Sequence, residues 1–279
     1  MGFGCNAAGV TGCRIIDSPR ERLIAIVTNN FVPCNGRFPT FIAIISMFFI
    51  GASMGIGNSV LAALLLTAVI VLGVCMTFIA SRFLSKTLLK GTPSFFTLEL
   101  PPYRRPQIGK VIVRSILDRT LFVLARAVCV AAPAGLVIWI MANAVVGDKS
   151  LLLHCSDFLN PFAQLLGMDG VILLAFILGF PANEIVIPIM IMAYMAKGNI
   201  LEMDNIFMLK ELLVENGWTW ITAISVMLFT LIHWPCSTTC LTIRKETQSL
   251  KWMLVSITVP AVMGMAVCLI FASLARLIS

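Results

Sequence analysis

The sequence predicts an all-α, polytopic helical membrane protein with two gate motifs that contain broken or re-entrant helices. Hydrophobic residues make up 59% of the 279 residues and charged residues only 12%, with a mean hydropathy of +0.98. A soluble domain carries about 25% charged residues. Several apolar stretches approach the ~20 residues that a membrane-spanning helix needs. Gly- and Pro-containing motifs interrupt two of them, and such breaks are tolerated in a bilayer only where they line a cavity or pack against protein.

Residues 1–81 are expected to form a partial first gate motif followed by two spans. Residues 1–37 contain six charged residues and scattered Gly and Pro, so they are too interrupted for a simple span. Residues 38–57 and 59–81 are apolar enough to cross the membrane, and the uncharged stretch GASMGIGNS joins them.

Residues 82–120 are predicted to be a basic loop on the cytoplasmic side. This segment contains eight Lys or Arg residues and two acidic ones. In a membrane protein such a cluster indicates a loop beside anionic lipid, not a nucleic-acid site. Within it, Lys110, Arg114 and Asp118 recur at four-residue spacing and predict an amphipathic helix at the membrane interface.

Residues 121–279 are predicted to contain the second gate region and the terminal spans. A span over residues 121–146 would lead to an outer, solvated loop at residues 147–161. The final span is expected over residues 252–278, with a kink at Pro260.

The segment 171–196 is predicted to be re-entrant. If it crossed as one helix, the acidic stretch after it would face the cytoplasm and the basic residues at 244–251 would face outside, against the positive-inside rule. The charges therefore favour two half-helices broken near Pro181. Just after the break lies Glu184, a carboxylate inside an apolar run, and a charge at that depth is expensive unless it has a role.

Two pieces of the chain share a pair of motifs in the same order. Residues 2–6 are GFGCN and residues 179–183 are GFPAN, while VPC at 32–34 corresponds to WPC at 234–236. Paired interrupted segments in corresponding positions indicate a transporter built from two repeats, with its binding site at the breaks.

With these motifs, the stretches GFGCNAAG, VPCNGRFP, LELPPYRRP, GFPANE and IHWPCSTTCLTIRKETQSLKWML resemble the membrane part of FeoB, the bacterial ferrous iron transporter. The resemblance runs over nearly the whole chain. It implies a multi-pass protein of the bacterial inner (cytoplasmic) membrane that takes up Fe²⁺. It also implies metal-ligand roles for Cys5, Cys34 and Cys236 in the gate motifs, and for Glu184 after the second gate's turn. Asn183 departs from the family, which commonly has lysine there.

The resemblance implies no permanently bound cofactor, because Fe²⁺ is the transported ion, and no enzymatic activity. FeoB proteins carry an amino-terminal GTPase domain, whereas nothing in this sequence matches the phosphate-binding pattern G-x-x-x-x-G-K-[ST]. The expected partners are therefore Fe²⁺, membrane lipid and a separate GTPase subunit, with self-association into a homo-oligomer left open.

Two alternative interpretations of the function stay open. The chain would otherwise be a gate-domain carrier of a different substrate, such as a nucleoside, or a non-transporting membrane subunit that packs with a partner. The three cysteines would then be packing residues in tight corners, and Glu184 would cap the second half-helix.

Three further candidates are weighed against simpler interpretations. His233 and Cys236 could form a base and nucleophile pair, but an interfacial histidine is the favoured interpretation. The cluster His154, Cys155 and Asp157 could collect metal on the outer loop, where ordinary solvated side chains are favoured. Cys240 could share a helix face with Cys236 and is a minor candidate.

Overall fold

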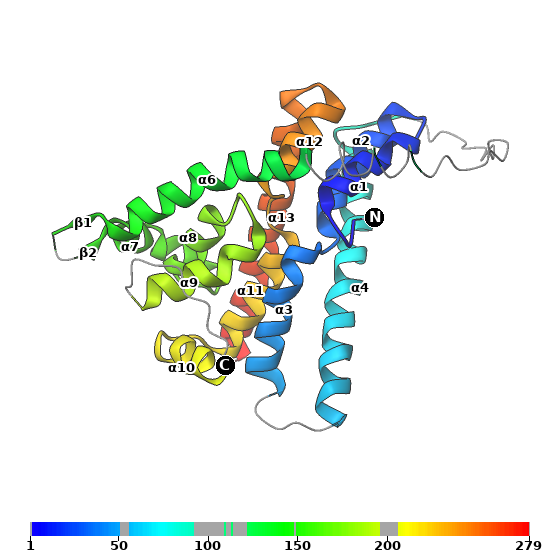
Figure 1. The fold of residues 1–279 in the computed structure, drawn as a ribbon. Helices are drawn as coiled ribbons and strands as arrows, with labels where there is room; N and C mark the ends of the chain where they lie inside the picture. The colour runs from blue at the N-terminus through cyan, green and yellow to red at the C-terminus, as the bar shows by residue number, and fades with distance from the viewer. Residues whose placement is uncertain are drawn as a thin grey trace.

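The protein is a polytopic helical membrane protein, as predicted (Figure 1). The computed structural model describes residues 2–50, 56–91, 109, 113, 122–147, 149–195 and 206–278. In these residues, helices alternate with short breaks, and the strands are confined to the hairpin β1 (Val145–Val146) and β2 (Lys149–Ser150). Four helical runs are long and apolar enough to cross a membrane: Pro19–Ile50, Gly57–Lys86, Trp220–Thr247 and Leu250–Ile278.

The first half of the chain forms one interrupted run and one long helix. Ser18 caps α2 by accepting a hydrogen bond from the backbone N–H of Glu21, and Pro19 occupies the first turn, where it costs no hydrogen bond. The elements in order are α1 (Asn6–Gly12), η1 (Cys13–Ile15), α2 (Pro19–Thr28), η2 (Asn29–Phe31), η3 (Asn35–Arg37), α3 (Phe38–Ile44), a π-helical turn (Ile45–Ile50) and α4 (Ile56–Lys86).

The second half contains more helices than the sequence predicted. Residues 147–161, expected to be a solvated loop, instead form part of the β-hairpin and most of α7, because the Ser150 hydroxyl caps the first turn of that helix. The elements are α6 (Phe122–Asn143), α7 (Leu151–Leu165), α8 (Gly170–Leu178), η6 (Asn183–Ile185), α9 (Val186–Tyr194), α10 (Ile206–Glu215), α11 (Trp220–Ile232), α12 (Ser237–Thr247) and α13 (Leu250–Ile278).

The helices α8 and α9 pack against each other as a helical hairpin. The helix α7 bends by 108° into α8, and the chain breaks again at Gly179–Pro181 before η6 and α9. The hydroxyl of Tyr194, the last residue of α9, donates to the carboxylate of Asp169, which caps the start of α8. The two ends of the segment therefore lie together, and the predicted break near Pro181 is present; that residues 171–196 re-enter the membrane stays a prediction.

Basic and acidic segments lie at opposite ends of the molecule. In Figure 1, α12 and α2 lie at the top and α10 at the bottom. Arg20 of α2 donates to the carbonyl of Leu89 just after α4, which brings the basic end of α4 to the same end as α12. This segregation agrees with the charge argument. The predicted amphipathic helix with Lys110, Arg114 and Asp118 lies outside the described residues.

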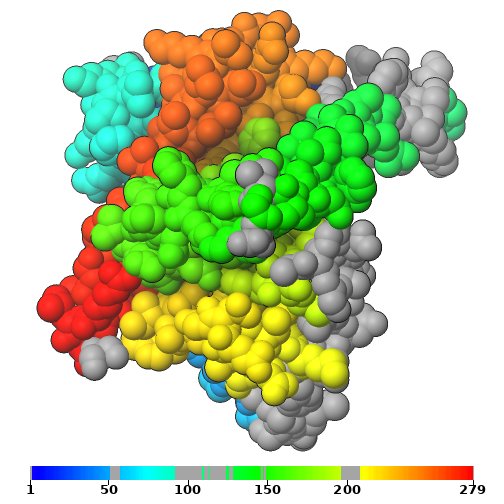
Figure 2. Space-filling view, turned by 90° about the vertical axis from the view of Figure 1, so that its left-hand side faces the viewer, coloured from blue at the N-terminus to red at the C-terminus, as the bar shows by residue number. Residues whose placement is uncertain are grey.

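The helix α11 is central and α4 is peripheral. In an apolar 18-residue window of the Trp220–Thr247 run, 72% of the residues are buried within the protein, whereas in the corresponding window of Gly57–Lys86 only 11% are. Phe229 of α11 packs edge-on against Phe176 of α8, with ring centroids 4.9 Å apart. Figure 2 shows one face of the molecule, on which α6 and α7 lie between α12 and α10.

Candidate functional site

The predicted gate cysteines occupy the same kind of position, directly before a helix. Cys5 precedes α1, Cys34 precedes η3 and Cys236 precedes α12, each with extended backbone. In the GFPAN motif, Ala182 holds this position before η6. A Pro or a Gly-rich turn stops the preceding segment at each break, and the chain restarts as a helix immediately after the cysteine or alanine.

The two motifs of each half pair with each other through the backbone. The N–H of Asn35, after Cys34, donates to the carbonyl of Gly4 at 3.2 Å. The N–H of Ser237, after Cys236, donates to the carbonyl of Phe180 at 2.9 Å. The sequence repeat is therefore also a structural repeat, in which each Pro-Cys break lies against the Gly-Phe turn of its own half.

The three cysteines gather where the two halves meet. The bond between Asn35 and Gly4 brings Cys5 beside Cys34. The backbone N–H of Arg37 donates to the carbonyl of Cys34, and its guanidinium donates to that of Trp234, two residues before Cys236. All three are free thiols: Cys5 is exposed, Cys236 is half-buried and Cys34 is 8% exposed. Residues from both ends of the chain thus place sulfur atoms in one region of the protein.

Glu184 lies beside the first Pro-Cys break. A Cβ added to Gly36 would lie 3.2 Å from Oε2 of Glu184, so the absence of a side chain at Gly36 lets η3 approach η6 closely. Within the described part of the chain, no hydrogen bond or ion pair engages this carboxylate. In the same residues, no group of three or more His, Cys, Asp or Glu side chains is close enough to hold a metal ion in one cage.

Asn183 connects the first Pro-Cys break to the second. Its side-chain amide lies 3.9 Å from the sulfur of Cys34 and 3.4 Å from Nε2 of His233. The other ring nitrogen of His233 lies 3.0 Å from the carbonyl of Phe229 and 2.9 Å from that of Thr230, so it carries the proton. With the proton on Nδ1, Nε2 faces Oδ1 of Asn183, which is also an acceptor, so these two atoms do not form a hydrogen bond in this tautomer.

The sequence suggested that His233 lies at the membrane interface, and the structure shows that this is wrong. It is 1% exposed, and its ring packs against Phe176 and Phe229. His233 directly follows the apolar α11, which places it in the protein interior. The neighbouring Trp234 had suggested an interfacial position instead. Cys236 contacts the hydroxyl of Thr239 at 3.2 Å, and the imidazole faces Asn183, so the base and nucleophile pair is not formed.

Arg37 is a functional candidate that the sequence analysis missed. It appeared there only as one of six charges that interrupt residues 1–37, yet its side chain is completely buried. Its guanidinium donates to backbone carbonyls of both halves. Its position in the sequence, as a single charge between a Pro-Cys motif and an apolar stretch, could have identified it.

The remaining sequence candidates lie elsewhere. Asp157 of α7 forms an exposed ion pair with Lys149 at 2.8 Å, and His154 and Cys155 belong to the same helix instead of an outer loop. Cys240 is buried, with its thiol 3.6 Å from the carbonyl of Pro235.

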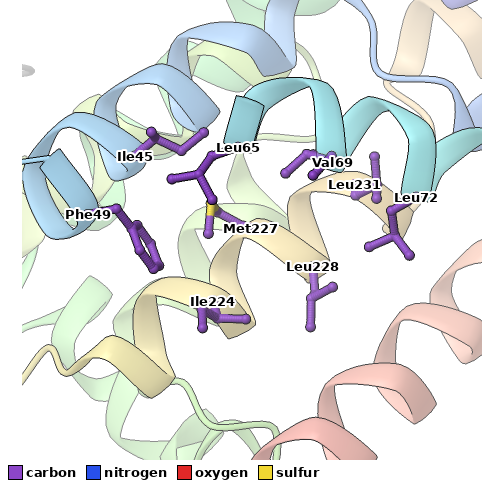
Figure 3. Close-up of a pocket in the computed structure, with 10 residues that line it drawn as sticks. Ile45, Phe49, Leu65, Val69, Leu72, Ile224, Met227, Leu228 and Leu231 are labelled. Atoms are coloured by element: carbon purple, nitrogen blue, oxygen red, sulfur yellow. The ribbon is translucent and has the colours of Figure 1, made fainter. Parts of the chain in front are cut away.

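An apolar pocket lies apart from the cysteines, between the π-helical turn, α4 and α11 (Figure 3). Its volume is about 210 Å³. All of its lining residues are apolar, so it offers no ligand to an ion. They are Ile45, Phe49, Leu65, Ala68, Val69, Leu72, Ile224, Met227, Leu228 and Leu231.

Comparisons with known proteins agree with the predicted resemblance. Residues 66–118 match the family described as "Ferrous iron transport protein B C terminus", and residues 124–250 match the family described as "Nucleoside recognition". No solved structure matches the chain.

Curated relatives align along nearly the whole chain. The chain is 29% identical to the Fe(2+) transporter FeoB of Staphylococcus aureus (strain MSSA476), over 99% of this chain and 40% of the relative. It is 26% identical to the Fe(2+) transporter FeoB of Leptospira interrogans, over 90% and 38% of the two chains. It is 24% identical to the Fe(2+) transporter FeoB of Methanocaldococcus jannaschii, over 100% of this chain and 41% of the relative. The chain thus spans about two fifths of the length of these relatives. The resemblance to the membrane region of FeoB is confirmed.

Proposed function

We propose that this chain, which is similar to the membrane region of FeoB transporters along nearly its whole length, transports ferrous iron across the bacterial inner membrane. One observation carries the proposal. Cys5, Cys34 and Cys236 precede three helices far apart in the sequence, yet they gather where the two halves meet. The relatives named as Fe(2+) transporters support iron as the ion.

The chemistry of these side chains suits a path for Fe²⁺. This ion accepts thiolate, imidazole and carboxylate ligands. Cys5, Cys34, Cys236 and Glu184 would act as ligands in succession, with His233 as an added imidazole. Successive weak sites favour conduction, because an ion must bind well enough to lose water and still leave quickly.

The partners follow from the same proposal. A GTPase subunit is among the proposed partners, and the uptake experiment below tests it. The helix α4 is largely unburied within the chain. It would therefore contact membrane lipid or a second copy of the chain.

The test is uptake of radioactive Fe²⁺ under anaerobic conditions by cells that express the chain, with and without a co-expressed GTPase subunit. Cys236→Ser and Glu184→Gln should both lower uptake. Cys75→Ser is the matched control, because the Cys75 thiol is exposed on the surface of α4. Background uptake by the wild-type chain in both settings, with the protein present in the membrane, would disprove the proposal.

A nucleoside carrier is the second candidate, because the matched family over residues 124–250 is described as nucleoside recognition. Thermal unfolding of the purified chain separates the two functions. A rise in the unfolding temperature with Fe²⁺ or Co²⁺, but not with nucleosides, supports a metal path. The reverse pattern supports the nucleoside carrier, and no response to either supports a non-transporting subunit.

A further inference from the structure

Arg37 is a buried cation that is held by oxygen atoms of both halves. Its Nη1 donates to the carbonyls of Asn30 at 2.8 Å and Leu231 at 2.9 Å. Its Nη2 donates to Oδ1 of Asn30 at 3.1 Å and to the carbonyls of His233 at 3.3 Å and Trp234 at 3.4 Å. The side chain is 0% exposed. Among the described residues, no carboxylate lies within ion-pair distance of it, so these oxygen atoms stabilise its charge.

Three of these acceptors lie where α11 ends: the carbonyl of Leu231 is in its last turn, and those of His233 and Trp234 directly follow the helix. The last carbonyls of a helix have no partner within that helix, and in transporters with broken helices such carbonyls coordinate the transported cation. Here the carbonyls of Leu231, His233 and Trp234 are engaged by Arg37, and that of His233 also accepts from Nδ2 of Asn30 at 2.6 Å. A guanidinium that is part of the protein therefore occupies the position where a hard cation would otherwise find oxygen ligands.

Occupation of these carbonyls changes which ligands the path offers. Carbonyl and carboxylate oxygens suit Ca²⁺ and Mg²⁺, whereas thiolate and imidazole suit transition metals. With the carbonyls engaged, the sulfur atoms of Cys34 and Cys236 and the ring nitrogen of His233 remain as successive ligands along the path, and within the described residues they do not form one metal cage.

The charge of Arg37 also favours thiolate ligands over neutral oxygen ligands in the path. It lies within electrostatic reach of Cys34 and Cys236. A cation bound only by neutral oxygens would lie beside an uncompensated positive charge, whereas thiolate ligands offset both charges.

We propose that Arg37 is a specificity-determining residue, which excludes hard divalent cations from the gate by occupying the carbonyl oxygens at the end of α11. This inference rests on the proposed function, because it assigns the selectivity of the same path.

The experiment uses the full chain in lipid nanodiscs, with Co²⁺ as a spectroscopic substitute for Fe²⁺ and Ca²⁺ as the hard competitor. Thiolate-to-cobalt charge-transfer absorption reports Co²⁺ on the cysteines, and Ca²⁺ is titrated against it. In Arg37→Met, the freed carbonyls should let Ca²⁺ displace Co²⁺ at a concentration at least about tenfold lower than in the wild type. Arg37→Lys keeps the charge with fewer donors and should give a smaller shift in the same direction.

Arg20→Met is the matched control. Arg20 also donates to backbone carbonyls, those of Leu89 and Ser85, but outside the gate. Its loss should leave the Co²⁺ to Ca²⁺ ratio unchanged even if stability falls. If Arg37→Met does not fold, the Ca²⁺ concentration that displaces Co²⁺ from Arg37→Lys alone tests the proposal.

The outcomes separate the two proposals. Charge-transfer absorption in the wild type, with an unchanged Ca²⁺ response in every folded Arg37 variant, overturns the specificity role and leaves the metal path standing. A wild-type chain that gives no such absorption with Co²⁺ overturns both.

Discussion

The hydroxyl of Tyr194 donates a hydrogen bond to the carboxylate of Asp169, so the last residue of α9 is joined to the residue that caps α8. The same hydroxyl accepts a hydrogen bond from the indole N–H of Trp218 at 2.9 Å. Asp169 also accepts from the backbone N–H of Ile172 at 2.7 Å. This network closes the base of the hairpin of α8 and α9, with Trp218 just before α11 as its third member.

Loss of the Tyr194 hydroxyl should destabilise the hairpin. A hydrogen bond to a charged group contributes about 1.5–3 kcal/mol, and Tyr194→Phe removes this one while it keeps the ring. We expect a lower midpoint of thermal unfolding in detergent. Thr258→Val is the control, because its exposed hydroxyl bonds only within α13. Equal midpoints for Tyr194→Phe and the wild type would contradict the proposed contribution of this network.

The ion pair between Arg14 and Glu246 should couple α1 to α12. Nε and Nη2 of Arg14 donate to the two carboxylate oxygens at 2.7 and 2.6 Å; the Arg14 side chain is 61% exposed and that of Glu246 is 11% exposed. Lys149 and Asp157 form a comparison pair in which the side chains are 55% and 59% exposed. Double-mutant cycles of unfolding free energy should give about 1 kcal/mol for the first pair and at most about 0.5 kcal/mol for the second, because exposed pairs are screened. A larger coupling for the exposed pair would show that burial does not govern these contacts.

The gate thiols should react at rates that follow their exposure. A water-soluble maleimide, with peptide mapping by mass spectrometry, should label Cys5 fastest and the buried Cys34 slowest, with Cys236 between them. Co²⁺ should slow labelling of these three. Cys75 and Cys129 are exposed on apolar helices, so only a membrane-permeant maleimide should reach them, and Co²⁺ should have no effect there. Protection of Cys75 equal to that of Cys236 would argue against a metal path at the gate.

Gly73 of α4 should tolerate no side chain. A Cβ there would lie 2.7 Å from the backbone carbonyl of Phe31, an atom that cannot rotate away. Gly73→Ala should therefore push α4 from the first Pro-Cys break and cost about 1–3 kcal/mol of unfolding free energy. In contrast, Gly135 of α6 has nothing within 4 Å of its added Cβ, so Gly135→Ala should be neutral or stabilising by up to about 1 kcal/mol. Denaturant titration of both variants measures the difference, and equal stability would refute the close contact at Gly73.

Features that depend on local sequence could be predicted. Gly179–Pro181 and the Pro-Cys motifs break the chain because Pro lacks an N–H and fixes its backbone, so the interruptions and the repeat were visible without a structure. The span at 59–81 was also predicted, although α4 begins at Ile56 and continues to Lys86, where charged residues do not stop a helix.

Features that depend on distant partners could not be predicted. The carbonyl of Leu231 that Arg37 engages is 194 residues away in the sequence, and the bond between Asn30 and His233 spans 203 residues. A charge in an apolar region therefore looked like an interruption until its acceptors were known. The roles of the gate cysteines and Glu184 as metal ligands stay predictions.

The length of α4 fixes the depth of the gate in the bilayer. Its 31 residues extend about 46 Å at 1.5 Å per residue, longer than the ~30 Å hydrocarbon layer, so the end that carries Arg82 and Lys86 reaches the aqueous headgroup region. Gly73 touches Phe31 and Pro33 of the first Pro-Cys break. It lies nine residues before Arg82, a distance of about 13 Å along the helix. That is close to half the hydrocarbon thickness, so with Arg82 at the edge of the hydrocarbon layer α4 would place the first Pro-Cys break near the bilayer midplane.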